Sequence, residues 1–335
     1  MEEKNIFFTV VIPTYNPKEY LPRMLESITH NDCVDKIEVI ISDDCSVIPF
    51  DEVIEEFKDR LYIRTISNEE HAGFPRNGRQ HGADEAKGKW FCFADQDDLF
   101  VDEAFDRILH FIKQNKAKNM IAADFIEEDV ETGERKIRDK NKGWTHGKFY
   151  EKEFWDKYGI RYDDVQYCED INLSIKISCL LSEKNLKKYD YNDPIYIWCR
   201  RGDSLASREY FIASMPDYAQ STLGVIIDYL EKNKDNQKLH EDYAIKFIST
   251  FLHMFFYFQS SILWDQKIKM METIEVIQPL YTRFKEATGL TNETLLYLLH
   301  TNMIEMYEQT REEDFSQIPF IEQMPIREWV NFYFE

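Results

Sequence analysis

Four short apolar runs alternate with helix-like segments in the first hundred residues of this 335-residue chain. The runs are rich in β-branched and aromatic residues, which is typical of strands covered on both faces, and they span residues 7–13, 37–42, 61–66 and 90–94. Apolar spacing after Pro17 and over 51–60 and 76–87 predicts helices between them. Strands that alternate with helices need crossover connections. We therefore predict an α/β fold, Rossmann-like, with a mostly parallel sheet flanked by helices.

The texture of the sequence changes near residue 207. A helix predicted from residue 169 and a short strand predicted at 194–199 are followed by long helix-like runs at 215–229, 243–263 and 291–307. No Gly- or Ser-rich linker separates the two parts. We predict a first domain over residues 1–206 and a helical C-terminal region over residues 207–335, which would serve as an acceptor platform or in homo-oligomer formation.

Composition excludes several classes of protein. The chain is 43% hydrophobic, which is enough for a substantial core, and its net charge of -21 argues against a nucleic-acid partner or charge-driven adhesion to a membrane. Its six cysteines occur singly, so the pattern predicts reduced thiols rather than zinc ligands or disulfides. The acidic start predicts no signal peptide, and the most apolar helical run, 247–258, is too short to span a membrane. We expect a cytoplasmic protein with at most peripheral membrane contact.

Three aspartates and a glutamine follow the strand predicted at 90–94: Asp95, Gln96, Asp97 and Asp98. Ligands bind at the carboxyl edge of open α/β sheets, and an Asp-x-Asp there offers the hard oxygen ligands that Mg²⁺ or Mn²⁺ prefers. Such an ion would neutralise a diphosphate. The alternative is that Asp97 or Asp98 only caps the helix predicted at 101–115. Neither G-x-G-x-x-G nor a P-loop occurs in the chain, so phosphates would have to be held in another way.

Five motifs in order, over residues 6 to about 205, resemble those of family 2 glycosyltransferases of GT-A fold. They are Pro13-Thr14-Tyr15-Asn16, Asp43-Asp44-x-Ser46, Asn68 with Gly73 and Arg76-Asn77, Asp95-x-Asp97-Asp98, and Glu169-Asp170. The resemblance implies that residues 1–206 form a GT-A domain. The C-terminal third of the chain lies outside it.

The resemblance implies a site for a UDP-sugar. Pro13, Thr14 and Tyr15 would line the nucleobase, and Asp43 or Asp44 would accept a hydrogen bond from uracil N3–H. Arg76 would contact phosphate or ribose, and Arg201 would clamp the diphosphate. The other expected nucleotide-sugar contacts are Asn68, Gly73, Asn77, Asp95 and Gln96. Ordinary turn and loop positions, with solvated arginines, are the alternative for each of these motifs.

The resemblance also implies a metal and a base. Asp97 would bind Mn²⁺ or Mg²⁺ directly, with Asp95 on the ribose or beside the ion, which would act as a Lewis acid for the leaving UDP. Asp170 would take the proton of the acceptor hydroxyl, and Glu169 would orient the acceptor or the base. The alternative is that Glu169 and Asp170 only stabilise a helix N-terminus. His146 would be a second base or, as the simpler alternative, a satisfied loop histidine.

Two departures from the family pattern stand out. Cys45 occupies a position where many members have glycine, so we expect a less tight loop there. A basic or membrane-inserting tail, as in polymerising members, is not seen, and this favours transfer of a single sugar.

The leading hypothesis is inverting, metal-dependent transfer of a sugar from a UDP-sugar to a hydroxyl of a cell-surface glycan, teichoic acid or lipid-linked acceptor. One alternative is a non-catalytic GT-A module whose helical C-terminal region binds a polymer or partner. A nucleotidyltransferase is a third possibility, but such enzymes generally need a Gly-rich basic loop where this chain has residues 13–16.

Overall fold

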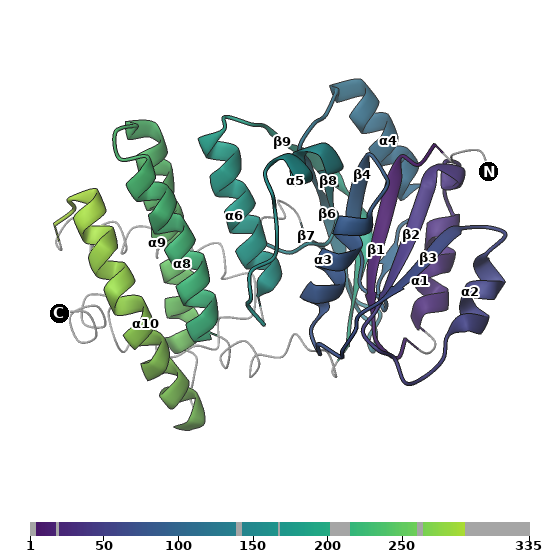
Figure 1. Ribbon diagram of the computed structural model, residues 1–335, viewed down its shortest axis with the longest axis horizontal. Helices are drawn as coiled ribbons and strands as arrows, with labels where there is room; N and C mark the ends of the chain where they lie inside the picture. Colours follow the sequence, from purple (N-terminus) through teal and green to yellow (C-terminus); the bar gives the residue numbers. More distant parts are fainter. Residues whose placement is uncertain are drawn as a thin grey trace. The chain divides into compact units, whose positions relative to one another are not determined.

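The computed structural model describes residues 5–17, 20–138, 143–166, 168–201, 215–259 and 264–291. The chain divides into two compact units, residues 1–162 with 186–204, and residues 163–185 with 205–335 (Figure 1). The described strands belong to the first unit, and the second is helical. Residues 163–185 group with the C-terminal helices, whereas the sequence-based boundary placed them in the first domain.

The first half of the sheet is parallel, as predicted. Strands β1 (Phe8–Thr14), β2 (Ile37–Asp43), β3 (Tyr62–Ser67) and β4 (Trp90–Phe93) are arranged in the order β3-β2-β1-β4. The predicted runs and the observed strands agree to within one or two residues at each end. Parallel pairing brings the carboxyl ends of neighbouring strands to one edge of the sheet.

The second half of the sheet is mixed. Beyond β4 the order is β8 (Lys148–Glu151), β6 (Met120–Asp129), β9 (Lys188–Arg200) and β5 (Leu99–Phe100), and β7 (Arg135–Arg138) forms a hairpin with β6. Only the β6–β9 pair is parallel here. The prediction of an α/β fold is confirmed. Among the described strands, parallel pairing is limited to β1–β2, β1–β4, β2–β3 and β6–β9. Strand β9 is much longer than predicted, because its polar first half has no apolar pattern.

Helices cover both faces of the sheet. Helices α1 (Tyr20–Thr29), α2 (Asp51–Phe57) and α4 (Ala104–Asn115) contribute apolar side chains to one core. On the other face, Gly82 of α3 (Pro75–Glu85) lies against Val11, and Trp155 of α5 (Lys152–Lys157) packs edge-on against Phe91. A single 3₁₀ turn, Val34–Lys36, leads into β2. This layering leaves the loops at the strand ends exposed for binding.

The described helices of the second unit are α6 (Glu169–Glu183), α8 (Met215–Lys232), α9 (Gln237–Gln259) and α10 (Trp264–Thr288). Its core includes the rings of Phe247 and Phe284, stacked with centroids 4.1 Å apart. The helices predicted at 169, 215–229 and 243–263 are confirmed over their described parts; α10 was not predicted, and the run at 291–307 lies outside the described residues except for its first. Within the described segments, no helix is both long and apolar enough for a membrane span.

Candidate functional site

The loops after β1 and β4 are joined by one side chain. Gln96 Oε1 accepts a hydrogen bond from the Tyr15 main-chain N–H at 3.0 Å, and Gln96 Nε2 donates to the Tyr15 carbonyl at 3.1 Å. Pro13 and Thr14 end β1 immediately before this contact. The structure therefore brings together the first and fourth of the motifs found in the sequence.

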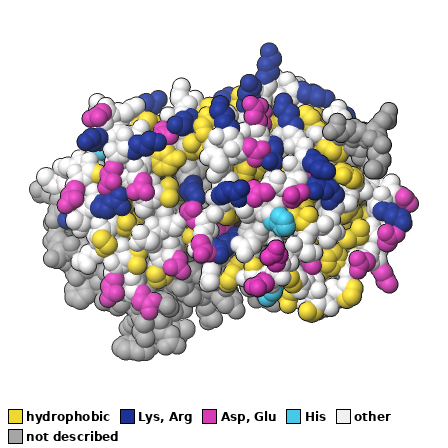
Figure 2. All heavy atoms as spheres, in the orientation of Figure 1, with side chains coloured by type: hydrophobic (Ala, Val, Ile, Leu, Met, Phe, Trp, Pro, Cys, Tyr) yellow, Lys and Arg dark blue, Asp and Glu magenta, His cyan; other side chains and the backbone are white. Residues whose placement is uncertain are grey.

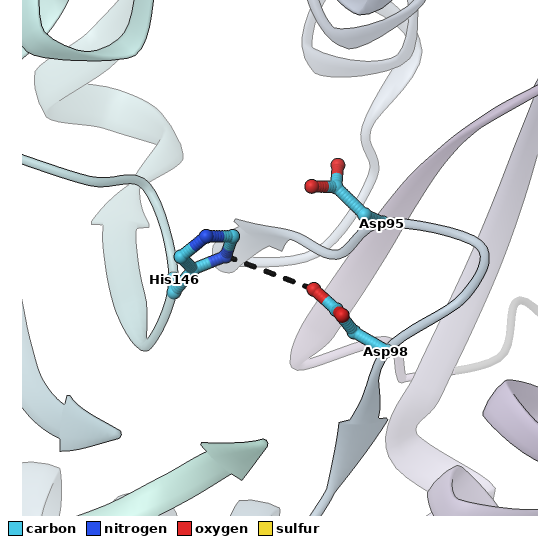
Figure 3. Close-up of side chains that lie close together, drawn as sticks. All are labelled: Asp95, Asp98 and His146. Atoms are coloured by element: carbon cyan, nitrogen blue, oxygen red, sulfur yellow. Dashed lines mark ion pairs between the residues drawn. The ribbon is translucent and has the colours of Figure 1, made fainter. Parts of the chain in front are cut away.

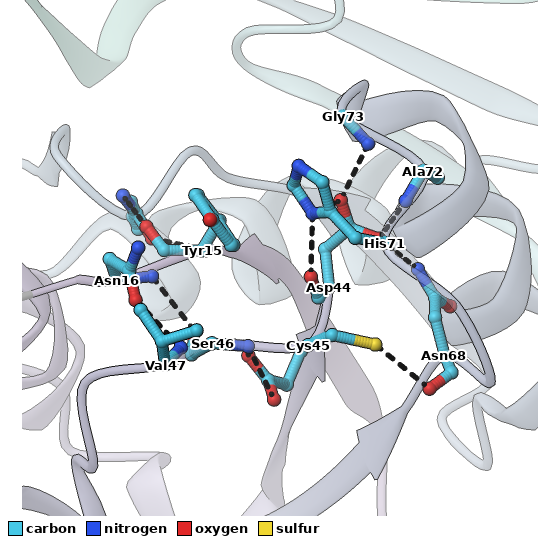
Figure 4. Close-up of polar contacts among 12 residues, drawn as sticks. Tyr15, Asn16, Asp44, Cys45, Ser46, Val47, Asn68, His71, Ala72 and Gly73 are labelled. Carbon is cyan, nitrogen blue, oxygen red and sulfur yellow. Dashed lines mark hydrogen bonds and ion pairs between the residues drawn. The ribbon is translucent and has the colours of Figure 1, made fainter.

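The loop after β2 is hydrogen-bonded to the loop after β1 (Figure 4). Asp43 accepts a hydrogen bond from the Ser46 main-chain N–H, and Ser46 Oγ accepts one from the Asn16 N–H at 2.8 Å. Cys45 has a φ of +63°, the left-handed conformation that favours glycine. The expected loosening of the backbone at Cys45 is therefore not found, because the cysteine adopts the tight conformation itself.

Asp44 organises the segment that precedes α3. Its Oδ1 accepts from Asn68 Nδ2 at 2.7 Å and from the Ala72 N–H at 2.9 Å, and its Oδ2 accepts from the Gly73 N–H at 2.8 Å. Gly73 has a φ of +76°, which lets the chain turn toward the carboxylate. The predicted residues Asp44, Asn68 and Gly73 thus form one connected group (Figure 4).

His71 belongs to this group and was missed by the sequence analysis. Its Nδ1 lies 2.9 Å from the Asp44 carbonyl oxygen, and its ring faces that of Tyr15 with centroids 4.4 Å apart (Figure 4). Both side chains are exposed. No spacing or motif singles out a histidine at this position. The pair provides an aromatic surface beside Asp44.

Asp95 is held by an arginine that the sequence analysis also passed over. Arg79, buried on α3, places Nη2 2.6 Å from Asp95 Oδ1. Burial opposes ionisation of Asp95, but the positive charge of Arg79 prevails and lowers the pKa of this carboxyl below its ordinary value. The predicted residues Arg76 and Asn77 lie in the first turn of the same helix.

Asp98 faces inward. Its Oδ2 accepts from the Tyr196 hydroxyl at 2.7 Å and its Oδ1 from the Cys199 N–H at 2.8 Å, so it fastens β9 to the loop after β4. Burial, together with the charges of Asp95 and Asp97, raises the pKa of Asp98 well above its ordinary value. The alternative that an aspartate here caps the next helix is wrong, because α4 begins after Glu103.

Asp97 forms an ion pair with Arg201, which follows the last residue of β9. The Arg201 guanidinium also lies over the ring of Tyr20, 4.1 Å from its centroid. Its neighbour Arg200 turns away and pairs with Asp129 at 3.0 Å. Of the basic pair, it is Arg201 that contacts the acidic cluster.

Asp95, Asp98 and His146 place one ligand atom each within 4.8 Å of one another (Figure 3). His146 is buried and stacks on Tyr196, with centroids 5.2 Å apart, which agrees with a satisfied loop histidine. These groups offer carboxylate oxygens and an imidazole nitrogen, which are ligand types that divalent ions such as Mn²⁺ accept. The Asp98 side chain is 2% exposed with both oxygens engaged, whereas those of Asp95 and Asp97 are 30% and 24% exposed. Asp95 and Asp97 are thus more accessible to solvent than Asp98.

Glu169 and Asp170 occupy the first turn of α6, as predicted, and belong to the second unit. Glu169 is buried and Asp170 is half-buried. Cys168 precedes them with a φ of +59°, so the chain turns sharply as the helix begins.

Residues 9–168 match the family model of glycosyl transferase family 2. These residues therefore form a glycosyl transferase family 2 domain. An uncharacterized glycosyltransferase of Haemophilus influenzae is 30% identical over 202 residues, 56% of this chain and 66% of the relative. The poly(ribitol-phosphate) beta-N-acetylglucosaminyltransferase TarS of Staphylococcus aureus is 28% identical over 109 residues, 32% of this chain and 19% of TarS. The matched regions therefore cover less than two thirds of each of these relatives.

The fold agrees with a solved structure. Residues 1–349 of S. aureus TarS, crystallised with UDP, superimpose with a TM-score of 0.65 at 16% identity, covering 98% of this chain and 91% of that one. The predicted GT-A fold followed by a helical C-terminal region is thereby confirmed.

Proposed function

We propose that this protein is an inverting, metal-dependent glycosyltransferase that moves a sugar from a UDP-sugar to a hydroxyl of a cell-surface glycan, teichoic acid or lipid-linked acceptor. The observation that carries the proposal is the direct attachment of the acidic loop to the Tyr15 loop through Gln96. In this proposal, the attachment would bring the groups that bind the diphosphate next to those that bind the nucleobase. TarS, which has been crystallised with UDP and with UDP-GlcNAc, supports a uridine donor.

In this proposal the nucleobase lies against Tyr15, with Pro13 and Thr14 behind it. Asp43 is the stronger candidate to accept the uracil N3–H, because its oxygens share one donor, the Ser46 N–H, among the described contacts. Three N–H groups already occupy the Asp44 carboxylate. Asp44 would then act by shaping the loop that carries Asn68 and Gly73.

The diphosphate would be met by arginine and amide groups from both sides of the acidic loop. Arg76 and Asn77 approach from the first turn of α3, and Arg201 from the end of β9. A divalent ion held by Asp95 and Asp97 would supply Lewis-acid stabilisation of the departing UDP. Arg79 keeps the Asp95 carboxylate ionised and oriented for that task.

Asp170 would accept the proton of the acceptor hydroxyl. The acceptor oxygen then forms a bond to the anomeric carbon as the bond to UDP breaks on the opposite side, which inverts the configuration. Glu169 would orient the acceptor or the base. All six cysteines are free thiols, which is usual in a reducing compartment, so we propose that the reaction takes place in the cytoplasm.

The test distinguishes the residue proposed to bind the metal and UDP, Asp97, from the proposed base, Asp170. Asp97→Asn is expected to abolish Mn²⁺-dependent binding of UDP, measured by calorimetry. Asp170→Asn is expected to keep that binding and to lose UDP release from UDP-GlcNAc with poly(ribitol phosphate) as acceptor. Asp102→Asn, at a highly exposed carboxylate, is the matched control. Wild-type behaviour of either site variant would refute the role given to that residue.

A further inference from the structure

A polar cluster, buried at its centre and partly exposed at its edge, lies between α6 and α8 of the second unit. Asn172 is fully buried, and its Nδ2 donates to Ser221 Oγ at 2.9 Å and to Thr222 Oγ1 at 3.1 Å. Ser221 Oγ in turn donates to Asp163 Oδ2 at 2.8 Å, and Asp163 Oδ1 pairs with Lys176. We call these five residues the Asn172 cluster. It connects the segment before α6, the helix itself and α8.

This polar contact stabilises the packing of α6 on α8 less than an apolar contact would. Asn172 Oδ1 is buried and accepts no hydrogen bond from the described residues. An unsatisfied buried acceptor costs about 1–3 kcal/mol, and an apolar side chain at such a contact would avoid that cost. What the amide adds is direction, since two hydroxyl groups on α8 fix both the rotation and the axial position of α6 at Asn172.

Asn172 stands two residues after Asp170 in the first turns of α6. Its main-chain N–H donates to the Cys168 carbonyl at 2.9 Å, which makes it part of the turn that carries Glu169 and Asp170. A rotation or slide of α6 at Asn172 would therefore move the Asp170 carboxylate with it. The hydroxyls of Ser221 and Thr222 oppose such a movement.

We propose that Asn172, Ser221 and Thr222 are positioning residues that set the orientation of Asp170 for proton abstraction. The inference rests on the proposed role of Asp170 as the base. It gives the C-terminal helices a part in the reaction, because α8 supplies both hydroxyls. Displacement of a reacting group by about 1 Å can cost up to about a hundredfold in rate. Nucleotide binding should not respond, since the candidate nucleotide groups belong to the first unit.

The experiment uses the full chain and variants that differ by single groups. Thr222→Val keeps the shape and removes the hydroxyl, whereas Thr222→Ser keeps the hydroxyl. We expect Thr222→Val combined with Ser221→Ala to lower kcat about tenfold for UDP release from UDP-GlcNAc with poly(ribitol phosphate). The affinity for UDP should stay at the wild-type value. Thr222→Ser should retain most of the rate.

Other outcomes are decisive as well. A double variant with wild-type kcat, or one in which kcat and UDP affinity fall together, would overturn the proposal. If the double variant fails to fold, Thr222→Val alone carries the same comparison with Thr222→Ser. Asp170→Asn in the same assay distinguishes a failure of the proposed function from a failure of the positioning role. If it still transfers sugar, the proposed function fails; if it is inactive while the double variant is fully active, only the positioning role fails.

Discussion

Gln96 holds Tyr15 by two hydrogen bonds, accepting from its main-chain N–H at 3.0 Å and donating to its carbonyl at 3.1 Å. A side-chain amide here replaces the backbone partner that a neighbouring strand would provide. The two loops follow β1 and β4, which pair directly in the sheet. The Tyr15 main chain and the acidic loop are therefore fixed relative to each other.

Gln96→Ala should weaken UDP binding about tenfold, because two hydrogen bonds that order the Tyr15 loop are lost at about 0.5–1.5 kcal/mol each. Calorimetry with Mn²⁺ present measures the change. Gln114→Ala, on the exposed side of α4, should bind as the wild type does. Equal affinity for Gln96→Ala and the wild type would contradict the role given to this contact.

Two helical glycines should respond to alanine in opposite directions. A Cβ at Gly82 of α3 would lie 2.2 Å from Val11 Cγ1, so Gly82→Ala should destabilise the fold by about 1–3 kcal/mol. At Gly224 of α8 a Cβ meets nothing within 4 Å, so Gly224→Ala should gain about 0.5–1 kcal/mol from helix propensity. Urea unfolding of the two variants gives both signs. A stabilising Gly82→Ala would mean that α3 packs differently on β1.

Cys45→Gly should stabilise the loop after β2. Cys45 has a φ of +63°. This left-handed conformation destabilises a residue with a Cβ by about 1 kcal/mol relative to glycine. Part of this gain is offset by the greater freedom of glycine in the unfolded chain. Thermal unfolding should show a modest rise in Tm, with Cys45→Ala close to the wild type. A clear fall in Tm for Cys45→Gly would show that the thiol contact with the Asn68 carbonyl outweighs the strain.

Arg283 gives the second unit a pH-dependent contact. It joins α10 to Glu231 at 2.8 Å and Asp228 at 2.9 Å on α8, and its hydrogen bond lowers the pKa of Glu231 below the ordinary value of 4.5. Since the folded-state pKa is the lower one, the stabilisation is complete above about pH 4.5 and is lost as the pH falls through the folded value. The groups are exposed, so Arg283→Gln should cost at most about 1 kcal/mol near pH 7.

Urea unfolding at pH 7 and pH 3.5 tests this dependence. The difference between Arg283→Gln and the wild type should shrink at the lower pH. Lys238→Gln, at an exposed position of α9, is the matched charge control and should show no such trend. A difference that is constant across this range would rule out the ion pair as its source.

The local pattern of the sequence predicted the strands that position the site. The runs that form β1, β2 and β4 are apolar because both faces of these strands are covered. The end of each run therefore predicted the edge of the sheet at which the polar motifs lie. The family pattern pointed to Asp44, Asn68 and Gly73, whereas the hydrogen bonds that join them come from the structure.

Contacts between distant segments could not be predicted in the same way. The inward orientation of the Asp98 carboxylate is explained by its hydrogen bonds to Tyr196 and Cys199, about a hundred residues further along the chain. Arg79 and His71 carry no spacing signal, although each contacts a predicted site residue. The assignment of α6 to the helical unit depends on its packing against α8, which its own sequence does not reveal.

The most direct test of the account is calorimetric titration of the protein with UDP, GDP and CDP, each with and without Mn²⁺. We predict that UDP binds, that the other two bind more weakly, and that UDP binding requires the metal. Binding of no nucleotide under either condition, or metal-independent binding without preference for UDP, would contradict the proposal that the loops at Tyr15, Asp44 and Asp97 form the donor site of a glycosyltransferase.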